Sequence, residues 1–133
     1  MQEIGHYING VNVAGQSDRT SDVFNPATGE VQAKVSLATV DEMNQAVVIA
    51  AKAQPAWATT NPQRRARVLM KFVDLLNRDM DKLAECLSRE HGKTLPDAAG
   101  DVVRGLEVVE YCIGAPQLLK GEFTENVGTD VDS

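Results

Sequence analysis

The first forty residues follow the alternating pattern of short strands that expose one face to solvent. Apolar side chains occupy every second position of residues 30–37, which predicts a half-buried strand. Asn9 and Gly10 lie between two short apolar runs and tolerate the positive φ angles of a two-residue hairpin turn. Residues 1–5 are expected to be a loose end. We expect residues 1–38 to form a small antiparallel sheet that needs helices on one face for stability.

Apolar residues change to helical spacing after residue 38 and predict three amphipathic helices within residues 39–120. Thr39 and Glu42 have the spacing of a capping box, in which each side chain accepts a hydrogen bond from the other residue's backbone. The first helix is therefore expected to begin here. Pro55 lacks an amide proton and is expected to kink or end this helix.

The second predicted helix runs from Asn61 to Gly92, a glycine suited to the left-handed position after a last turn. Its apolar stripe is regular, and the polar residues 77–79 are expected to bend it. The third helix begins at Thr94. Residues 121–133 show little periodicity and are expected to be a loop or a truncated end. These elements together predict an α+β fold.

The composition of the chain says more about its possible partners than about its fold. The net charge is −6 and the pI is near 4.8, which argues against a nucleic-acid partner because such binders usually carry a basic patch. No secretory signal pattern and no apolar run long enough to cross a bilayer are visible. Cys86 and Cys112 lack a CxxC spacing and fall in helical stripes, so buried, inert thiols are expected. A cytoplasmic location follows as the expectation.

Few residues are candidates for chemistry. The chain contains no glycine-rich dinucleotide or phosphate motif and no clustered metal ligands, and His6 and His91 are expected to be surface or capping residues. Lys93 is expected to neutralise the negative end of the preceding helix. Arg104 lies between glycines on a predicted packed helix and can offer a two-point fork to a carboxylate. By spacing alone, the commoner alternative is an exposed arginine that pairs with a neighbouring carboxylate on its own helix.

Several motifs resemble the N-terminal part of aldehyde dehydrogenases, and they extend over nearly the whole chain. The motifs are Tyr7-Ile8-Asn9-Gly10, Asn25-Pro26-Ala27-Thr28-Gly29-Glu30-Val31, Glu90-x-Gly92-Lys93 and Asp97-Ala98-x-Gly100-Asp101-Val102-x-Arg104-Gly105. The second and third motifs recur across the superfamily. The last motif is similar to that of the CoA-acylating methylmalonate-semialdehyde (malonate-semialdehyde) dehydrogenases.

The resemblance implies that residues 1–133 are the N-terminal portion of an α/β NAD-binding domain in a homo-oligomeric enzyme. It implies NAD as cofactor, coenzyme A as co-substrate and a carboxylated semialdehyde as substrate. It also implies that Arg104 helps to hold the substrate carboxylate. The family's catalytic cysteine and most cofactor contacts lie outside the matched region, so no catalytic, cofactor-binding or metal-binding residue is assigned. The fragment alone is expected to be inactive.

Two alternative functions are compatible with the same residues. A hydrolytic NAD(P)-dependent aldehyde dehydrogenase would share the turn motifs without needing the motif around Arg104. A non-enzymatic helical oligomerisation module would use the apolar stripes as a homomeric interface, because large exposed apolar patches commonly mark interaction sites. The substrate profile of an Arg104 variant separates the first alternative, and a monodisperse, cooperatively melting chain would favour the second.

Overall fold

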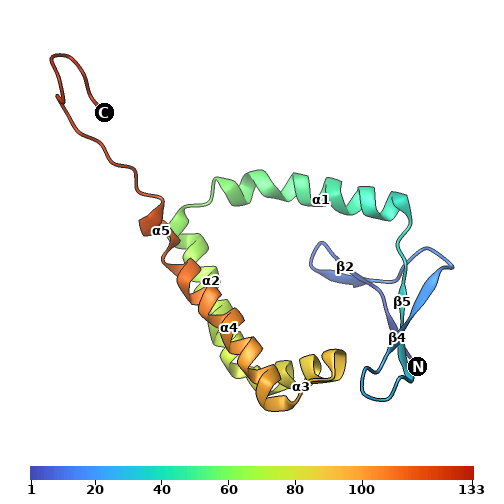
Figure 1. The fold of residues 1–133 in the computed structure, drawn as a ribbon. Coiled ribbons are helices and arrows are strands. Elements are labelled where there is room, and N and C mark those ends of the chain that lie inside the picture. The colour runs from blue at the N-terminus through green and yellow to red at the C-terminus, as the bar shows by residue number, and fades with distance from the viewer.

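The computed structural model describes residues 1–133 and shows an open chain of ten elements (Figure 1). The strands lie at one end, the long helix α1 leads away from them, and the remaining helices form a separate packed unit. The strands are β1 (Gln2–Ile4), β2 (His6–Ile8), β3 (Val11–Val13), β4 (Thr20–Phe24) and β5 (Val31–Ser36). The helices are α1 (Val40–Ala58), α2 (Pro62–Arg78), α3 (Met80–His91), α4 (Leu95–Ile113) and α5 (Ala115–Leu118).

Strands β2 and β3 form the predicted hairpin. They pair antiparallel, with Ile8 opposite Val11. Asn9 and Gly10 have φ angles of 55° and 79°, the left-handed values that a type I′ turn requires at both central positions. The hairpin prediction is therefore confirmed.

The other strands correct the expectation of one antiparallel sheet. β5 is the central strand of a three-stranded sheet in which β4 pairs antiparallel and β1 pairs parallel. The expected loose end at residues 1–5 therefore contains a strand, with Gln2 opposite Ala33. Its short run of residues carries no periodic signal, and its pairing depends on a partner about thirty positions away.

Helix α1 begins as predicted and makes no extensive contact with another helix. Thr39 Oγ1 accepts the Glu42 amide at 3.1 Å, and the Glu42 carboxylate accepts the Thr39 amide at 2.8 Å. Pro55 lies inside the helix, which ends three residues later at Ala58. Val47 and Val48 remain exposed, so this helix has no covered apolar face in the chain.

A break at Asp79 divides the second predicted helix into α2 and α3. The Asp79 carboxylate accepts hydrogen bonds from Arg78 at 2.5 Å and from Lys82 at 3.1 Å. These bonds, with Arg78 the larger cause, lower the pKa of Asp79 to about 2. The predicted bend is therefore a full interruption, and the structure has five helices where three were expected.

The covered part of the helical unit is built largely from small side chains. Helix α4 packs on both α2 and α3, and α5 lies against α2 and α4. Ala98 is fully buried, Ala66 and Ala84 are nearly so, and Leu106 is the one large apolar side chain in this core. Small residues allow the helix backbones to approach closely, so α2, α3 and α4 form one compact layer.

Two turns complete the architecture. Gly92, in the left-handed conformation with φ 83°, ends α3 as predicted and lies against Pro26 in the turn between β4 and β5. This contact links the helical unit to the sheet. Residues 121–133 project away from the other elements (Figure 1), and two backbone hydrogen bonds between Thr124 and Ser133 close the last ten residues into a loop.

Candidate functional site

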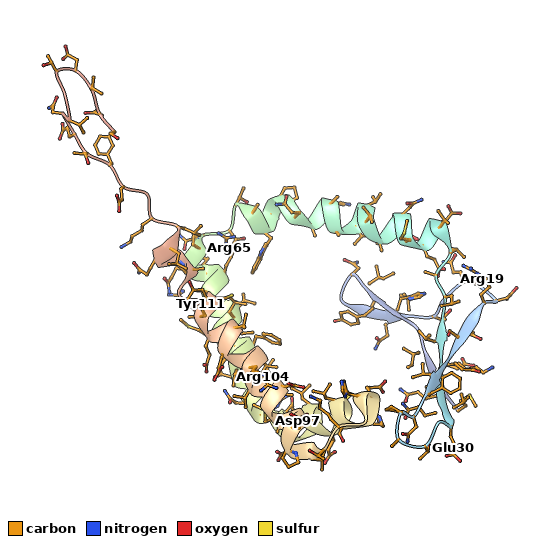
Figure 2. All side chains as sticks on the ribbon, viewed as in Figure 1. Arg19, Glu30, Arg65, Asp97, Arg104 and Tyr111 are labelled. Atoms are coloured by element: carbon orange, nitrogen blue, oxygen red, sulfur yellow. The ribbon has the colours of Figure 1, made fainter.

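Arg104 lies on α4 between Asp97 and Tyr111, with its side chain on the surface (Figure 2). The side chain is 66% exposed, and its guanidinium donates a hydrogen bond through Nη2 to Asp101, three residues earlier on the same helix. An arginine has five N–H donors, so this contact leaves most of the guanidinium free. The structure therefore places Arg104 in the helical ion pair that spacing alone favours, with donors still available to a ligand.

Lys93 and two aspartates extend this ion pair into a four-residue network. Lys93 Nζ lies 2.9 Å from Asp97 Oδ2 and also donates to Asp101, which receives Arg104 on its other oxygen. Only 15% of the Lys93 side chain is exposed. The hydrogen bond from Lys93, followed by that from Arg104, lowers the pKa of Asp101, and Asp101 in turn raises the pKa of Lys93. Asp101 is thus ionised at neutral pH and holds both cations in place.

The network corrects the expectation for Lys93. Its ammonium pairs with Asp97 and Asp101 in the first turns of α4 and donates no hydrogen bond to a carbonyl at the end of α3. Local hydrogen bonds cap the end of α3. The Gly92 amide donates to the Ser88 carbonyl, and Ser88 Oγ donates to the Lys93 carbonyl. Capping by Gly92 and Ser88 leaves the lysine side chain available to α4.

Neither glycine beside Arg104 is required by packing within this chain. A methyl group at Gly100 would lie 3.8 Å from Arg104 Nη1, an ordinary contact distance. A methyl group at Gly105 would have no neighbour within 4 Å. The space above these glycines is therefore open around the guanidinium.

The cysteines and histidines differ in part from expectation. Cys86 and Cys112 are free thiols, and both are exposed, so the prediction of buried thiols is wrong. Both thiols lie on parts of α3 and α4 that the neighbouring helices leave accessible to solvent. His91 is exposed at the end of α3, whereas His6 has a buried Nε2 without a hydrogen-bond partner, so its assignment to the surface is wrong.

Sequence reasoning missed two polar groups. The Glu42 carboxylate also accepts the Gln16 amide at 2.8 Å, which ties the loop before β4 to the start of α1. Arg65 has a buried Nε without a partner at the start of α2. Of these two groups, only Arg65 could have been found from the sequence. Arginines occupy positions 64, 65 and 67, and the first turn of that helix contains no acidic residue to balance them.

The connection from β5 to α1 does not fit a dinucleotide. Phosphates in such sites bind the free amides and positive end of a helix after a glycine-rich turn. Here the Glu42 carboxylate accepts the Thr39 amide and the Thr39 hydroxyl accepts the Glu42 amide, and the negative charge of Glu42 would repel a phosphate. The side chains also form no group of three or more potential metal ligands, and none of the helices has the length and apolar composition needed to cross a membrane.

Comparison with known proteins places this geometry in a family. Residues 13–132 match the family model described as "Aldehyde dehydrogenase family". The malonate-semialdehyde dehydrogenase of Pseudomonas aeruginosa is 47% identical over 133 residues, which cover 100% of this chain and 27% of that protein. The acylating, mitochondrial methylmalonate-semialdehyde dehydrogenase of Arabidopsis thaliana is 45% identical over 130 residues, covering 98% of this chain and 21% of that protein.

The fold comparison agrees with the sequence comparison. The crystal structure of a Sinorhizobium meliloti protein in complex with NAD superposes on this chain with a TM-score of 0.89 and 62% sequence identity. The match covers 99% of this chain and 27% of the other. This chain thus spans about a quarter of the length of the relatives it matches, and its α+β arrangement corresponds to part of their NAD-binding domain. The chain belongs to the aldehyde dehydrogenase family.

Proposed function

We propose that residues 1–133 are the N-terminal portion of the cofactor-binding domain of an NAD-dependent, CoA-acylating (methyl)malonate-semialdehyde dehydrogenase. In this reaction the aldehyde is oxidised, NAD is reduced, the acyl group passes to coenzyme A and the substrate carboxylate leaves as carbon dioxide. The products are acetyl-CoA or propionyl-CoA. The observation that carries the proposal is the 47% identity, over the full chain, to a malonate-semialdehyde dehydrogenase. The word "acylating" in the name of the Arabidopsis relative supports coenzyme A as the acceptor.

Arg104 is the residue that we propose to bind the substrate carboxylate. Its guanidinium is exposed, and Asp101 engages it on one side. Lys93 holds Asp101 in turn, so the arginine is oriented before a ligand arrives. The remaining N–H groups can form the two parallel hydrogen bonds with which arginine recognises a carboxylate. Open space above Gly100 and Gly105 leaves room for that ligand.

Cofactor and nucleophile are proposed to come from residues outside this chain. The start of α1 is closed to a phosphate by Glu42, so NAD contacts are not assigned to residues 1–133. Neither Cys86 nor Cys112 is assigned as the nucleophile. Activation of a thiol needs a base or a positive field, and the hydrogen bonds of the chain supply only one long contact of 3.9 Å from Arg89 Nη2 to Cys86 Sγ. The 133-residue chain by itself is therefore expected to have no dehydrogenase activity. NADH formation by the purified chain with semialdehyde, NAD and coenzyme A would contradict this.

The substrate assignment is tested with Arg104→Leu in the full-length enzyme. We expect the variant to lose about 10–100-fold in kcat/KM for malonate semialdehyde, the equivalent of one lost charge-assisted contact of about 1.5–3 kcal/mol. Activity with propanal, which has no carboxylate, should be unchanged. Arg89→Leu is the matched control, because Arg89 is an exposed arginine on α3. An equal loss for both aldehydes would refute a specific role for Arg104.

The identity of the product separates the proposed enzyme from a hydrolytic one. With coenzyme A present, the proposed reaction forms a thioester, whereas a hydrolytic aldehyde dehydrogenase releases a free acid at a rate independent of coenzyme A. Mass spectrometry of the products distinguishes the two outcomes. A free carboxylic acid as the sole product would favour the hydrolytic alternative.

A further inference from the structure

A pocket of about 190 Å³ lies where α1, α2, α4 and α5 meet, far from Arg104 along the helical unit. Its walls are mostly apolar and include Trp57 of α1, Leu69 of α2, Cys112 of α4 and Pro116 of α5. Cys112 is eight positions after Arg104 on α4, a distance of about 12 Å along the helix axis. The pocket is open to solvent on one side, and its volume is sufficient for a compact apolar group, since an enclosed cavity of roughly 150 Å³ already holds benzene.

Arg65 supplies the one charged group in this apolar wall. Figure 2 shows it at the start of α2, close to the end of α1. Its Nε is buried without a hydrogen-bond partner, and its guanidinium forms no ion pair in the chain. Buried polar groups in folded proteins nearly always have a partner, and each exception needs a physical explanation. An acceptor on a ligand would satisfy this donor.

The surroundings of Arg65 favour an acceptor with negative charge. Arg64 and Arg67 lie within the same region of α2, also outside any ion pair, and the first turn of the helix contains no acidic residue. The positive end of the helix dipole adds to these charges. This concentration of positive charge is unusual in a chain whose net charge is −6. The pocket thus combines an apolar floor with a positive edge.

We propose that this pocket binds a small carboxylate with a compact aromatic body. The ring would lie in the apolar part beside Trp57 and Leu69, where aromatic contact adds to burial. The carboxylate would accept a charge-assisted hydrogen bond from Arg65. The site is separate from Arg104 and does not depend on the proposed dehydrogenase activity.

Alkylation of the two thiols provides a direct test on the 133-residue chain. Cys112 lines the pocket, whereas Cys86 is exposed on α3 away from it, so one molecule carries both the reporter and its control. Phenylacetate is the probe, and phenylacetamide is its neutral counterpart of nearly the same shape. At a probe concentration ten times its Kd, iodoacetamide should modify Cys112 about tenfold more slowly, because about nine-tenths of the pockets are occupied. The rate at Cys86 should not change.

The charge dependence completes the test. Phenylacetamide should protect Cys112 much less than phenylacetate does, and Arg65→Gln should remove the difference between the two probes. Arg64→Gln is the control variant, because Arg64 is on the same helical turn but does not line the pocket. Trp57, the sole tryptophan, gives an independent fluorescence readout from the pocket wall. Equal protection by both probes in the wild-type chain, protection of both thiols alike, or no protection would each overturn the proposal without relying on a variant.

Discussion

Replacing Gly92 by alanine should destabilise the junction between α3 and the turn that joins β4 to β5. Gly92 has φ 83°, and an L-residue in this left-handed region costs about 1–2 kcal/mol. The added methyl would also lie 3.2 Å from Pro26 Cγ and 3.3 Å from Pro26 Cβ, which is closer than ordinary contact. The proline must therefore shift, or the turn must move with it. Together these effects should lower the free energy of unfolding by about 2 kcal/mol.

Two other glycines make the experiment internally controlled. Gly105 lies inside α4, and a methyl group there meets nothing within 4 Å, so alanine should stabilise the helix by about 1 kcal/mol. Gly29 has φ 75° but no neighbour within 4 Å, so alanine at this position isolates the backbone strain from the contact with Pro26. The same chemical change is thus expected to act in opposite directions at Gly92 and Gly105.

Urea unfolding followed by far-ultraviolet circular dichroism measures all three variants. With a slope of about 1–3 kcal/mol per molar urea, Gly92→Ala should lower the midpoint by on the order of 1 M. Gly29→Ala should lower it less, and Gly105→Ala should raise it. A midpoint for Gly92→Ala at or above that of the wild-type chain would refute the argument from backbone conformation. Equal losses at Gly92 and Gly29 would show that the contact with Pro26 contributes nothing.

Three further predictions follow from named contacts. Backbone hydrogen bonding to Thr39 lowers the pKa of Glu42 below its ordinary value of 4.5, so its contribution to stability is complete above pH 4.5 and is lost as the pH falls through the folded-state pKa. Glu42→Gln should remove this part of the pH dependence in circular dichroism titrations. Leu106→Ala should cost about 2–5 kcal/mol in urea unfolding, because it empties part of the helical core, and a loss below 1 kcal/mol would contradict the observed burial. Asp101→Asn should bring the raised pKa of Lys93 back toward its ordinary value in an NMR titration, and an unchanged pKa would exclude the hydrogen bond.

The open shape of the chain is consistent with its relatives' greater length. Val47 and Val48 of α1 are more than half exposed. Apolar surface of this extent commonly marks an interaction site. We propose that Val47 and Val48 pack against other parts of the full-length enzyme or against a second copy of it, and sedimentation velocity of the isolated chain should show concentration-dependent association.

The sequence by itself determined the features that depend on residues close together in the chain. The hairpin turn at Asn9 and Gly10 and the capping box between Thr39 and Glu42 form as predicted, because the backbone angles and hydrogen-bond partners lie within a few residues. The left-handed end of α3 at Gly92 has the same local origin. The spacing of charged residues also predicted, as one alternative, that Arg104 pairs with a carboxylate on its own helix. The structure shows this pairing with Asp101.

Only the tertiary structure decided which elements meet. The parallel pairing of β1 with β5, the amide of Gln16 on the Glu42 carboxylate and the reach of Lys93 to Asp101 each join different elements of the chain. The exposure of both cysteines was also decided at this level. Periodicity records which side chains share a face of a helix, whereas burial requires a second element to cover that face, and in this chain much of α1 has none.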